Sequence, residues 1–188
     1  MSDFSIKPVL TGDQVVLRPF VDEDVPVFLE AIADPEVARL TGSPPGDAPD
    51  EDRTRAWYGS RNSQDDRLDL AVVDRASGAC VGEVVLNEWD PHNRSCSFRT
   101  LFVAAGRNRG LGTEAVRLIV GYGFERLALH RISLEVYAHN PRARRVYEKV
   151  GFVAEGVLRQ ALWAGDDWID ATVMSILAHE WPAPARPE

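Results

Sequence analysis

Hydrophobic and polar positions in the first half of the chain predict several strands with little helix between them. Residues 15–20 alternate as a strand does, and residues 21–37 follow with an acidic first turn and an apolar stripe typical of a helix. A Gly-, Pro- and Asp-rich stretch then predicts a mobile loop before a second helix. Three extended segments come next, joined by connectors too short for helices, which predicts an antiparallel meander. The predicted loop spans residues 40–53 and the helix residues 52–62, and the three strands span residues 68–74, 80–89 and 95–105.

The second half of the chain changes to a pattern in which helices alternate with strands. A glycine-containing loop opens an amphipathic helix, a strand follows, and a short helix begins on Pro141. Two further strands turn at Gly165-Asp166-Asp167, and a Pro-rich tail, residues 182–188, is expected to fray. The two helices span residues 112–127 and 141–151, the strand between them spans residues 131–140, and the last two strands lie within residues 152–178. We therefore predict a single domain, residues 1–188, of mixed α/β (α+β) class with an antiparallel first half.

Composition narrows the classes of partner. The 188 residues are 45% hydrophobic and 27% charged, which is enough for one packed core. The formal net charge is −8, whereas proteins that bind duplex nucleic acid or anionic membranes are usually basic, so we expect neither partner. No secretory signal or membrane-spanning run is visible. Cys80 and Cys96 suggest neither a disulfide framework nor a metal site, which predicts a cytoplasmic protein without a metal.

The segment RNRGLGTEAV, residues 107–116, has the composition of an anion-binding loop. Gly110 and Gly112 let a ligand approach the backbone, and the start of a helix offers unpaired N–H groups and the positive end of the helix dipole. A kinase-type phosphate loop needs a lysine after the second glycine, and Thr113 stands there. A dinucleotide fingerprint, with Glu135 as the ribose partner, and a simple connector stay open on the loop alone. The helix-free strands before the loop argue against the dinucleotide fold.

Two segments, in the right order, resemble the GNAT superfamily of N-acetyltransferases. Residues 107–112 fit the signature Gln/Arg-x-x-Gly-x-Gly/Ala, and residues 140–152 fit N-x-x-A-x-x-x-Y-x-K-x-G-F at each defined position. The first strand and the end of the chain resemble the ribosomal-protein N-terminal (alanine) acetyltransferase branch, so the likeness covers residues 15–181. It implies a GNAT fold: a central mixed sheet of about seven strands, the fourth and fifth splayed apart, flanked by about four helices.

The resemblance implies acetyl-CoA as the co-substrate. The loop backbone would hold the coenzyme A pyrophosphate, and Arg107 and Arg109 would add positive charge. Asn140, at the end of the fifth strand, would bond the cofactor or only cap the following helix. On that helix Arg142, Arg144 and Arg145 would reach the 3′-phosphate or form a solvated face. The pantetheine arm would pair with the fourth strand as a guest strand. The residues expected to bind coenzyme A are Leu101, Phe102, Val103, Arg107, Asn108, Arg109, Gly110, Leu111, Gly112, Thr113, Asn140 and Arg144.

Acetyl transfer to an amine requires a polarised carbonyl, a neutral amine and a protonated leaving thiol. Tyr147 is the expected general acid, because a phenol is protonated at neutral pH, with simple packing against the sheet as the alternative role. Glu83 is one candidate for the general base, because its strand could point it into the acceptor cleft. The alternatives that stay open for the base are an ordered water relay, Glu155, Asp170, His92 and His139.

The sequence thus predicts an acyl-CoA-dependent N-acyltransferase that acts on a primary amine by direct attack. The acceptor is a small-molecule or peptide amine, and the ribosomal-type ending favours a protein N-terminus by analogy. The acidic loop 47–52 and the negative net charge favour a cationic amine such as a polyamine or an aminoglycoside, unless the loop is merely solvated. Another acyl-CoA and a non-catalytic coenzyme A-binding regulator stay open as alternatives, as does assembly into a homodimer.

Overall fold

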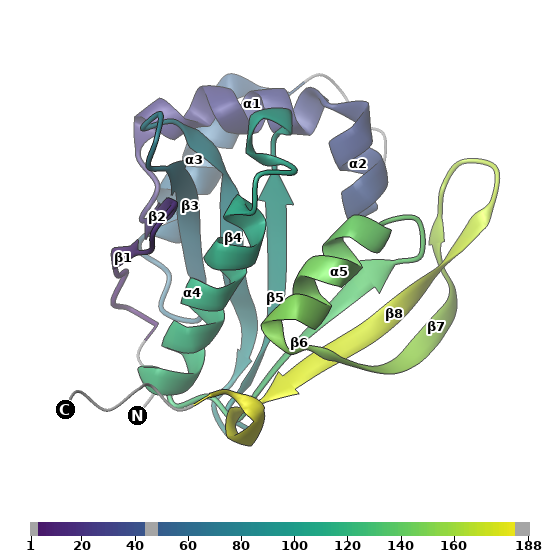
Figure 1. Cartoon of the computed structure of the whole chain (residues 1–188). Helices are drawn as coiled ribbons and strands as arrows, with labels where there is room; N and C mark the ends of the chain where they lie inside the picture. The colour runs from purple at the N-terminus through teal and green to yellow at the C-terminus, as the bar shows by residue number, and fades with distance from the viewer. Residues whose placement is uncertain (1–3, 44–48, 183–188) are drawn as a thin grey trace.

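The computed structural model describes residues 4–43 and 49–182, and its centre is one mixed sheet of eight strands (Figure 1). The strands lie in the order β1-β2-β3-β4-β5-β6-β8-β7. Neighbours pair antiparallel except β5 and β6, which run parallel. The strands are β1 (Leu10–Thr11), β2 (Val15–Arg18), β3 (Leu68–Asp74), β4 (Cys80–Asp90), β5 (Ser95–Phe102), β6 (Arg131–Tyr137), β7 (Val153–Trp163) and β8 (Trp168–Leu177).

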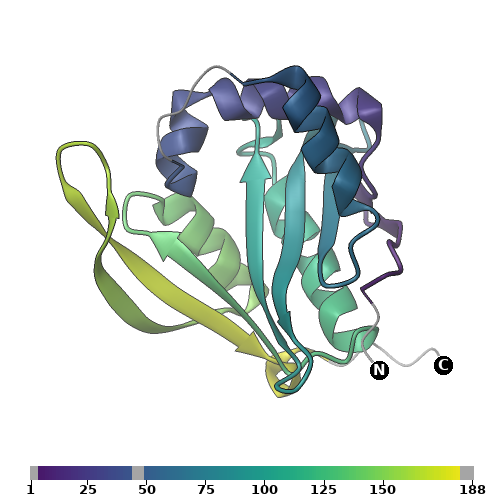
Figure 2. The same ribbon diagram turned by 180° about the vertical axis from the view of Figure 1, so that it is seen from behind.

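Helices cover both faces of the sheet. α4 and α5 lie on one face and α3 on the other, while α1 and α2 run across the end toward which β5 points (Figures 1 and 2). This coverage leaves a core on each face of the central strands. The helices are α1 (Val25–Ala33), α2 (Pro35–Thr41), α3 (Glu51–Arg61), α4 (Leu111–Glu125) and α5 (Pro141–Val150).

β5 and β6 pair only at their beginnings, where Ser95–Ser97 stands beside Arg131–Ser133. β5 nevertheless stays paired with β4 as far as Phe102, and β6 with β8 as far as Tyr137. Past the first three pairs the two strands separate. Among the described residues, alternate N–H and C=O groups of β5 that face β6 are therefore left without a strand partner. The predicted splaying of the fourth and fifth strands is confirmed, and the separated strands are β5 and β6.

The apolar stripe of α4 packs onto the sheet and forms a large part of the core. Ala115 and Ile119, one helical turn apart, are fully buried, as their spacing predicts. Val84, Val85 and Leu86 are consecutive in β4 and all fully buried, because helices cover both faces of the strand. The mixed α/β class and the antiparallel first half are confirmed.

The single helix predicted over residues 21–37 is wrong, because α1 and α2 are separate. Asp34 has an extended backbone with ψ 114°, and Pro35 begins α2, since the residue before a proline disfavours the helical conformation. The Asp34 carboxylate then caps α2 by accepting a hydrogen bond from the Glu36 N–H at 2.8 Å. Ile32, an apolar position within the helix predicted over residues 21–37, is 48% exposed. This break adds one helix to the expected four, and the two-residue β1 adds one strand to the expected seven.

The end of the chain forms the predicted hairpin. β7 and β8 pair antiparallel up to Trp163 and Trp168, on either side of the predicted turn at Gly165. Residues 44–48 of the predicted loop and 183–188 of the predicted tail lie outside the described residues. Over the part of the chain that is described, no helix is long and apolar enough to cross a membrane.

Candidate active site

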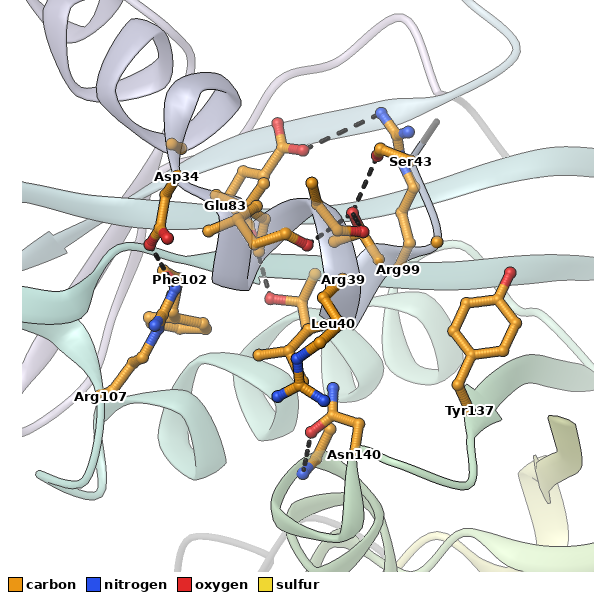
Figure 3. Close-up of a pocket in the computed structure, with 18 of the residues that line it drawn as sticks. Asp34, Arg39, Leu40, Ser43, Glu83, Arg99, Phe102, Arg107, Tyr137 and Asn140 are labelled. Atoms are coloured by element: carbon orange, nitrogen blue, oxygen red, sulfur yellow. Dashed lines mark hydrogen bonds and ion pairs between the residues drawn. The ribbon is translucent and has the colours of Figure 1, made fainter. Parts of the chain in front are cut away.

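A cleft of about 2230 Å³ opens where β5 and β6 separate. Its walls come from α1, α2 and α3 on one side and from the glycine loop, α4 and α5 on the other (Figure 3). Most residues predicted for the site line this one cleft: Glu83, Leu101, Phe102, Arg107, Asn108, Gly110, Gly112, Thr113, Asn140 and Tyr147. Four predicted residues lie outside its lining: Val103, Arg109, Leu111 and Arg144.

The glycine loop presents backbone N–H groups at the start of α4. Asn108 and Gly110 have φ values of 61° and 83°, left-handed conformations that turn the chain sharply into the helix. Within the described chain, no acceptor is found for the N–H groups of residues 108–112, whereas those of Thr113 and Glu114 bond to the Gly110 carbonyl. Unpaired N–H groups at the positive end of a 15-residue helix form a site suited to a phosphate or pyrophosphate.

Apolar side chains fix this loop to the sheet and leave space above it. Val103 and Leu111 are 5% and 2% exposed and belong to the core, so only their backbone is available to a ligand. Phe102 lines the cleft. A Cβ atom added to Gly112 would meet the Phe102 ring at 3.6 Å, an ordinary contact. The surface above Gly112 is therefore open for a ligand, as the predicted coenzyme A contacts require.

The Arg107 side chain joins the loop to α2. Its Nε donates to the Phe102 carbonyl at 2.8 Å, and its Nη1 meets Glu36 at 2.5 Å. Its Nη2 meets Asp34 at 3.3 Å (Figure 3). The side chain is only 9% exposed. Two carboxylates already balance its charge, so Arg107 braces the end of β5 against the start of α2. Its contact with pyrophosphate stays a prediction.

Arg109 and Glu114 anchor the other side of the loop. Arg109 pairs with the buried Asp74 at the end of β3, at 2.9 Å. The Glu114 carboxylate accepts hydrogen bonds from the N–H groups of Asp13, Gln14 and Val15 at 2.6, 2.8 and 3.0 Å. Both side chains therefore hold the start of α4 to the first strands of the sheet, and the contact of the half-exposed Arg109 side chain with pyrophosphate stays a prediction.

The start of α5 lies beside the loop. Asn140 lines the cleft and caps α5, because its Oδ1 accepts a hydrogen bond from the Ala143 N–H at 3.1 Å. Arg144 pairs with Glu148 at 2.9 Å, one turn along the helix. The predicted cofactor contacts of Asn140 and Arg144 stay predictions. The cations of α5 that do line the cleft are Arg142, Arg145 and Lys149.

Glu83 lies on β4 opposite Leu101 of β5 and lines the cleft. It is 5% exposed, and its Oε2 has no hydrogen-bond partner within the described chain. Nη2 of Arg99 approaches its Oε1 to 4.0 Å (Figure 3). Burial raises the pKa of Glu83 to about 7, against the opposing effect of Arg99. A carboxyl group with an unpaired oxygen and a pKa near neutrality suits a general base.

Tyr147 lies on α5, which covers one face of the sheet. The residue is 7% exposed, and its ring packs edge-on against Phe98 with 6.0 Å between centroids. Burial raises the pKa of the phenol, so it stays protonated at neutral pH. Tyr147 also lines the cleft, and none of the described residues forms a hydrogen bond with its hydroxyl. Its packing role is observed, and its role as an acid stays a prediction.

The other candidate bases lie outside the lining of the cleft. Glu155 is bound by Arg131, which lowers the pKa of Glu155 to about 2. Asp170 accepts a hydrogen bond from a backbone N–H of β7. His92 is exposed in the turn after β4, and His139 stacks on a tyrosine ring. Of the side chains considered, Glu83 alone faces the site.

Several lining residues were not selected from the sequence. Arg99 lies two positions before Leu101 in β5, so both side chains are on the same face of the strand. The alternation of side chains along a strand could therefore have identified Arg99 from the sequence. Arg39, Arg53 and Trp57 line the cleft from α2 and α3. These residues reach the cleft only because of the way α2 and α3 pack near β5, so no local sequence pattern predicts that they line it.

A split mixed sheet with an anion loop beside the split defines an acyl-CoA-dependent N-acyltransferase. The Acetyltransferase (GNAT) domain family matches residues 14–153, and the chain belongs to this family. It is accordingly an acetyltransferase that uses acetyl-CoA, and the glycine loop belongs to this fold and not to a dinucleotide-binding unit.

The sequence is similar to those of N-acetyltransferases whose names refer to different acceptors or to none. It is 27% identical over 173 residues to the uncharacterized N-acetyltransferase YnaD of Bacillus subtilis, covering 92% of this chain and 98% of that protein. It is 30% identical over 118 residues to spermidine N(1)-acetyltransferase of Escherichia coli, covering 63% of each. It is 30% identical over 104 residues to the Bacillus subtilis protein named "Putative ribosomal N-acetyltransferase YdaF", covering 55% and 57%.

Solved structures share the fold. The spermidine N-acetyltransferase of Vibrio cholerae, in complex with CoA and spermine, matches with a TM-score of 0.81 at 24% identity, over 90% of this chain and 98% of that chain. A GNAT-family acetyltransferase from Bacillus anthracis matches with a TM-score of 0.79 at 23% identity, over 92% and 100%. These similarities support the architecture of the sheet and helices.

Proposed function

We propose that the protein transfers an acetyl group from acetyl-CoA to a primary amine in the gap between β5 and β6. The observation that carries this proposal is the gap itself, with the unpaired N–H groups of residues 108–112 beside it and Glu83 in its lining. Acetyl-CoA supplies the acyl thioester. The loop binds the pyrophosphate, and the unpaired backbone groups of β5 orient the pantetheine arm toward Glu83 and Tyr147.

Glu83 lies on β4 within the sheet and Tyr147 on α5, which covers one face of the sheet, so the two side chains reach the cleft from different elements, which suits two separate proton transfers. Glu83 accepts a proton from the amine as its nitrogen bonds to the thioester carbonyl carbon. A backbone N–H of β5 stabilises the charge that develops on the carbonyl oxygen. Tyr147 donates its proton to the sulfur as the C–S bond breaks. The products are the N-acetyl amine and the free thiol of coenzyme A.

The finer identity of the acceptor is a separate proposal. The relatives carry names that refer to spermidine and to ribosomal acetylation, and both are acetylations of amines. The resemblance of the chain to the ribosomal branch rests on its two ends and on one relative of modest coverage. The acidic loop does not decide for a polyamine either, because Asp50 caps α3 and Asp47 lies outside the described residues.

We also propose that two copies of the chain associate through β7. This strand is the outer edge of the sheet, and nearly all of its residues are exposed. Val153, Val157, Leu158 and Trp163 are 55%, 57%, 43% and 52% exposed, which is unusual for a free edge. Sedimentation equilibrium is expected to show a dimer for the wild type and a monomer for Val157→Lys. A monomeric wild type at micromolar concentrations contradicts this assembly.

The test of the proposed activity is release of free thiol from acetyl-CoA over a panel of primary amines. We expect turnover with at least one amine class and saturable acetyl-CoA binding measured by calorimetry. Coenzyme A binding without thiol release on any amine would point to the non-catalytic regulator instead. Absence of coenzyme A binding would reject the site itself.

A further inference from the structure

The half of the cleft walled by α2, α3 and β5 carries three arginines, Arg39, Arg53 and Arg99. Two carboxylates in the same half, Asp34 and Asp50, cap α2 and α3 by accepting hydrogen bonds from backbone N–H groups. The carboxylates in this half, Asp34, Asp50 and Glu83, equal the arginines in number, but Arg39 and Arg53 have no ionic partner among the described residues.

Arg99 is the arginine closest to the candidate base. Its Nη2 lies 3.9 Å from Asp69 and 4.0 Å from Glu83, and both separations exceed hydrogen-bond length. Asp69 is held instead by Arg67, whose Nε and Nη2 donate to its two oxygens at 2.6 and 2.9 Å. The Arg99 side chain is 47% exposed. A guanidinium with unused donors thus stands beside the buried and unpaired Oε2 of Glu83.

We propose that the acceptor is an amine with a carboxylate on the neighbouring carbon, such as a free amino acid, which places its amine at Glu83 and its carboxylate at Arg99. This inference rests on the proposed acetyl transfer. In such a molecule the nitrogen and the carboxyl carbon are about 2.5 Å apart, which suits two opposite charges separated by 4.0 Å. A guanidinium binds a carboxylate through two parallel hydrogen bonds.

The other acceptor classes fit this half of the cleft less well. A polyamine brings additional positive charge toward Arg39 and Arg53, where like charges repel. A peptide N-terminus has an amide where the amino acid has its carboxylate, so it leaves Arg99 without an anionic partner. A further carboxylate in the lining, Glu135, belongs to β6 across the gap.

The protonation of Glu83 adds to this argument. Because burial raises the pKa of Glu83 to about 7, a large fraction of this carboxyl group is neutral near that pH. Arg99 then has even less compensating charge. A carboxylate on the acceptor supplies the missing negative charge at the position where the geometry already offers donors.

The decisive experiment compares three versions of each acceptor: the amino acid, its carboxamide and its decarboxylated amine, with spermidine added to the panel. We expect kcat/KM from thiol release to be about 10- to 100-fold higher for the acid than for the carboxamide, the range for a charged hydrogen-bonded pair. The carboxamide has the less basic amine, because it lacks the adjacent negative charge. A preference for the acid therefore cannot come from a more readily deprotonated nucleophile.

Variants separate recognition from catalysis. Arg99→Gln is expected to bring the acid-to-amide ratio close to one, mainly through KM, and Arg99→Lys to retain part of it. Glu83→Gln is expected to lower turnover of all acceptors and to keep the ratio. Arg126→Gln, an exposed arginine outside the lining of the cleft, is the matched control and is expected to change neither.

The outcomes are distinguishable. Thiol release with equal kcat/KM for acid and carboxamide, a preference for spermidine, or a ratio that survives Arg99→Gln each overturn this inference and leave the acetyl transfer intact. Failure of every amine to release thiol, while acetyl-CoA still binds, overturns the proposed activity and the inference with it.

Discussion

Nη2 of Arg99 and Oε1 of Glu83 lie 4.0 Å apart across the β4–β5 pair, with one side chain half exposed and the other buried. In the register of the two strands, Glu83 is opposite Leu101, so Arg99 is its diagonal neighbour on the same face. Desolvation favours the neutral form of Glu83 and Asp69 adds to this effect, whereas the charges of Arg99, Arg67 and Arg61 oppose it. The balance places the ionisation of Glu83 near neutral pH.

The first prediction concerns the pH dependence of turnover. A base must be deprotonated, so kcat/KM is expected to rise as pH increases through about 7, the pKa of Glu83. Glu83→Gln should lower the plateau by about 100-fold and remove this inflection. Initial rates of thiol release between pH 5.5 and 9 test this, with the exposed Glu30→Gln on α1 as control. An unchanged inflection in Glu83→Gln would assign the base to another group.

The second prediction concerns stability: Glu83→Gln, which should lower turnover, should raise the free energy of unfolding. The pKa of Glu83 in the folded protein, about 7, lies above its ordinary value of 4.5. Between these values the folded state binds more protons than the unfolded chain, so stability falls as pH rises through this window. Glu83→Gln should therefore raise the free energy of unfolding at pH 8, by up to about 3 kcal/mol, and have little effect at pH 4. Urea unfolding at both pH values measures the difference, and equal effects at the two would contradict the assignment.

The third prediction compares two glycines of the loop. A Cβ atom at Gly112 meets only the Phe102 ring, so Gly112→Ala should fold normally, and Gly112→Leu should weaken coenzyme A binding at least about tenfold by filling the space over the N–H groups. Gly110 has φ 83°, so Gly110→Ala should cost about 1–2 kcal/mol in stability. Calorimetry with coenzyme A and thermal unfolding separate the two effects. Unchanged affinity in Gly112→Leu would mean that the loop is only a connector.

The main parts of the architecture were predictable because they depend on local signals. The glycines and the helix stripe locate the anion loop, and the short connectors between the first strands define the antiparallel half. Pro35 also carried a local signal, since a proline restricts the residue before it, yet the apolar stripe on both sides favoured one continuous helix.

The role of the loop arginines was not predictable in the same way. The carboxylates that pair with Arg107 and Arg109 are Asp34, Glu36 and Asp74, which lie 35 to 73 positions away in the chain. Only the folded arrangement shows that these cations are already balanced. The same holds for Arg99 and Glu83, because their proximity depends on the register of two strands and not on the residues of either strand alone.

The last prediction separates the two roles of Tyr147. The ring packs against Phe98 and Phe152, while its hydroxyl has no hydrogen-bond partner among the described residues, so Tyr147→Phe keeps the packing and removes only the proton donor. We expect kcat to fall by about 100-fold, with the free energy of unfolding and the Kd for coenzyme A nearly unchanged. Tyr147→Ala, as a contrast, should also lower stability by about 3 kcal/mol or more, because it leaves a cavity beside both rings. Thiol-release kinetics, calorimetry and urea unfolding distinguish these outcomes. Full turnover in Tyr147→Phe would limit Tyr147 to packing and assign protonation of the thiolate to water.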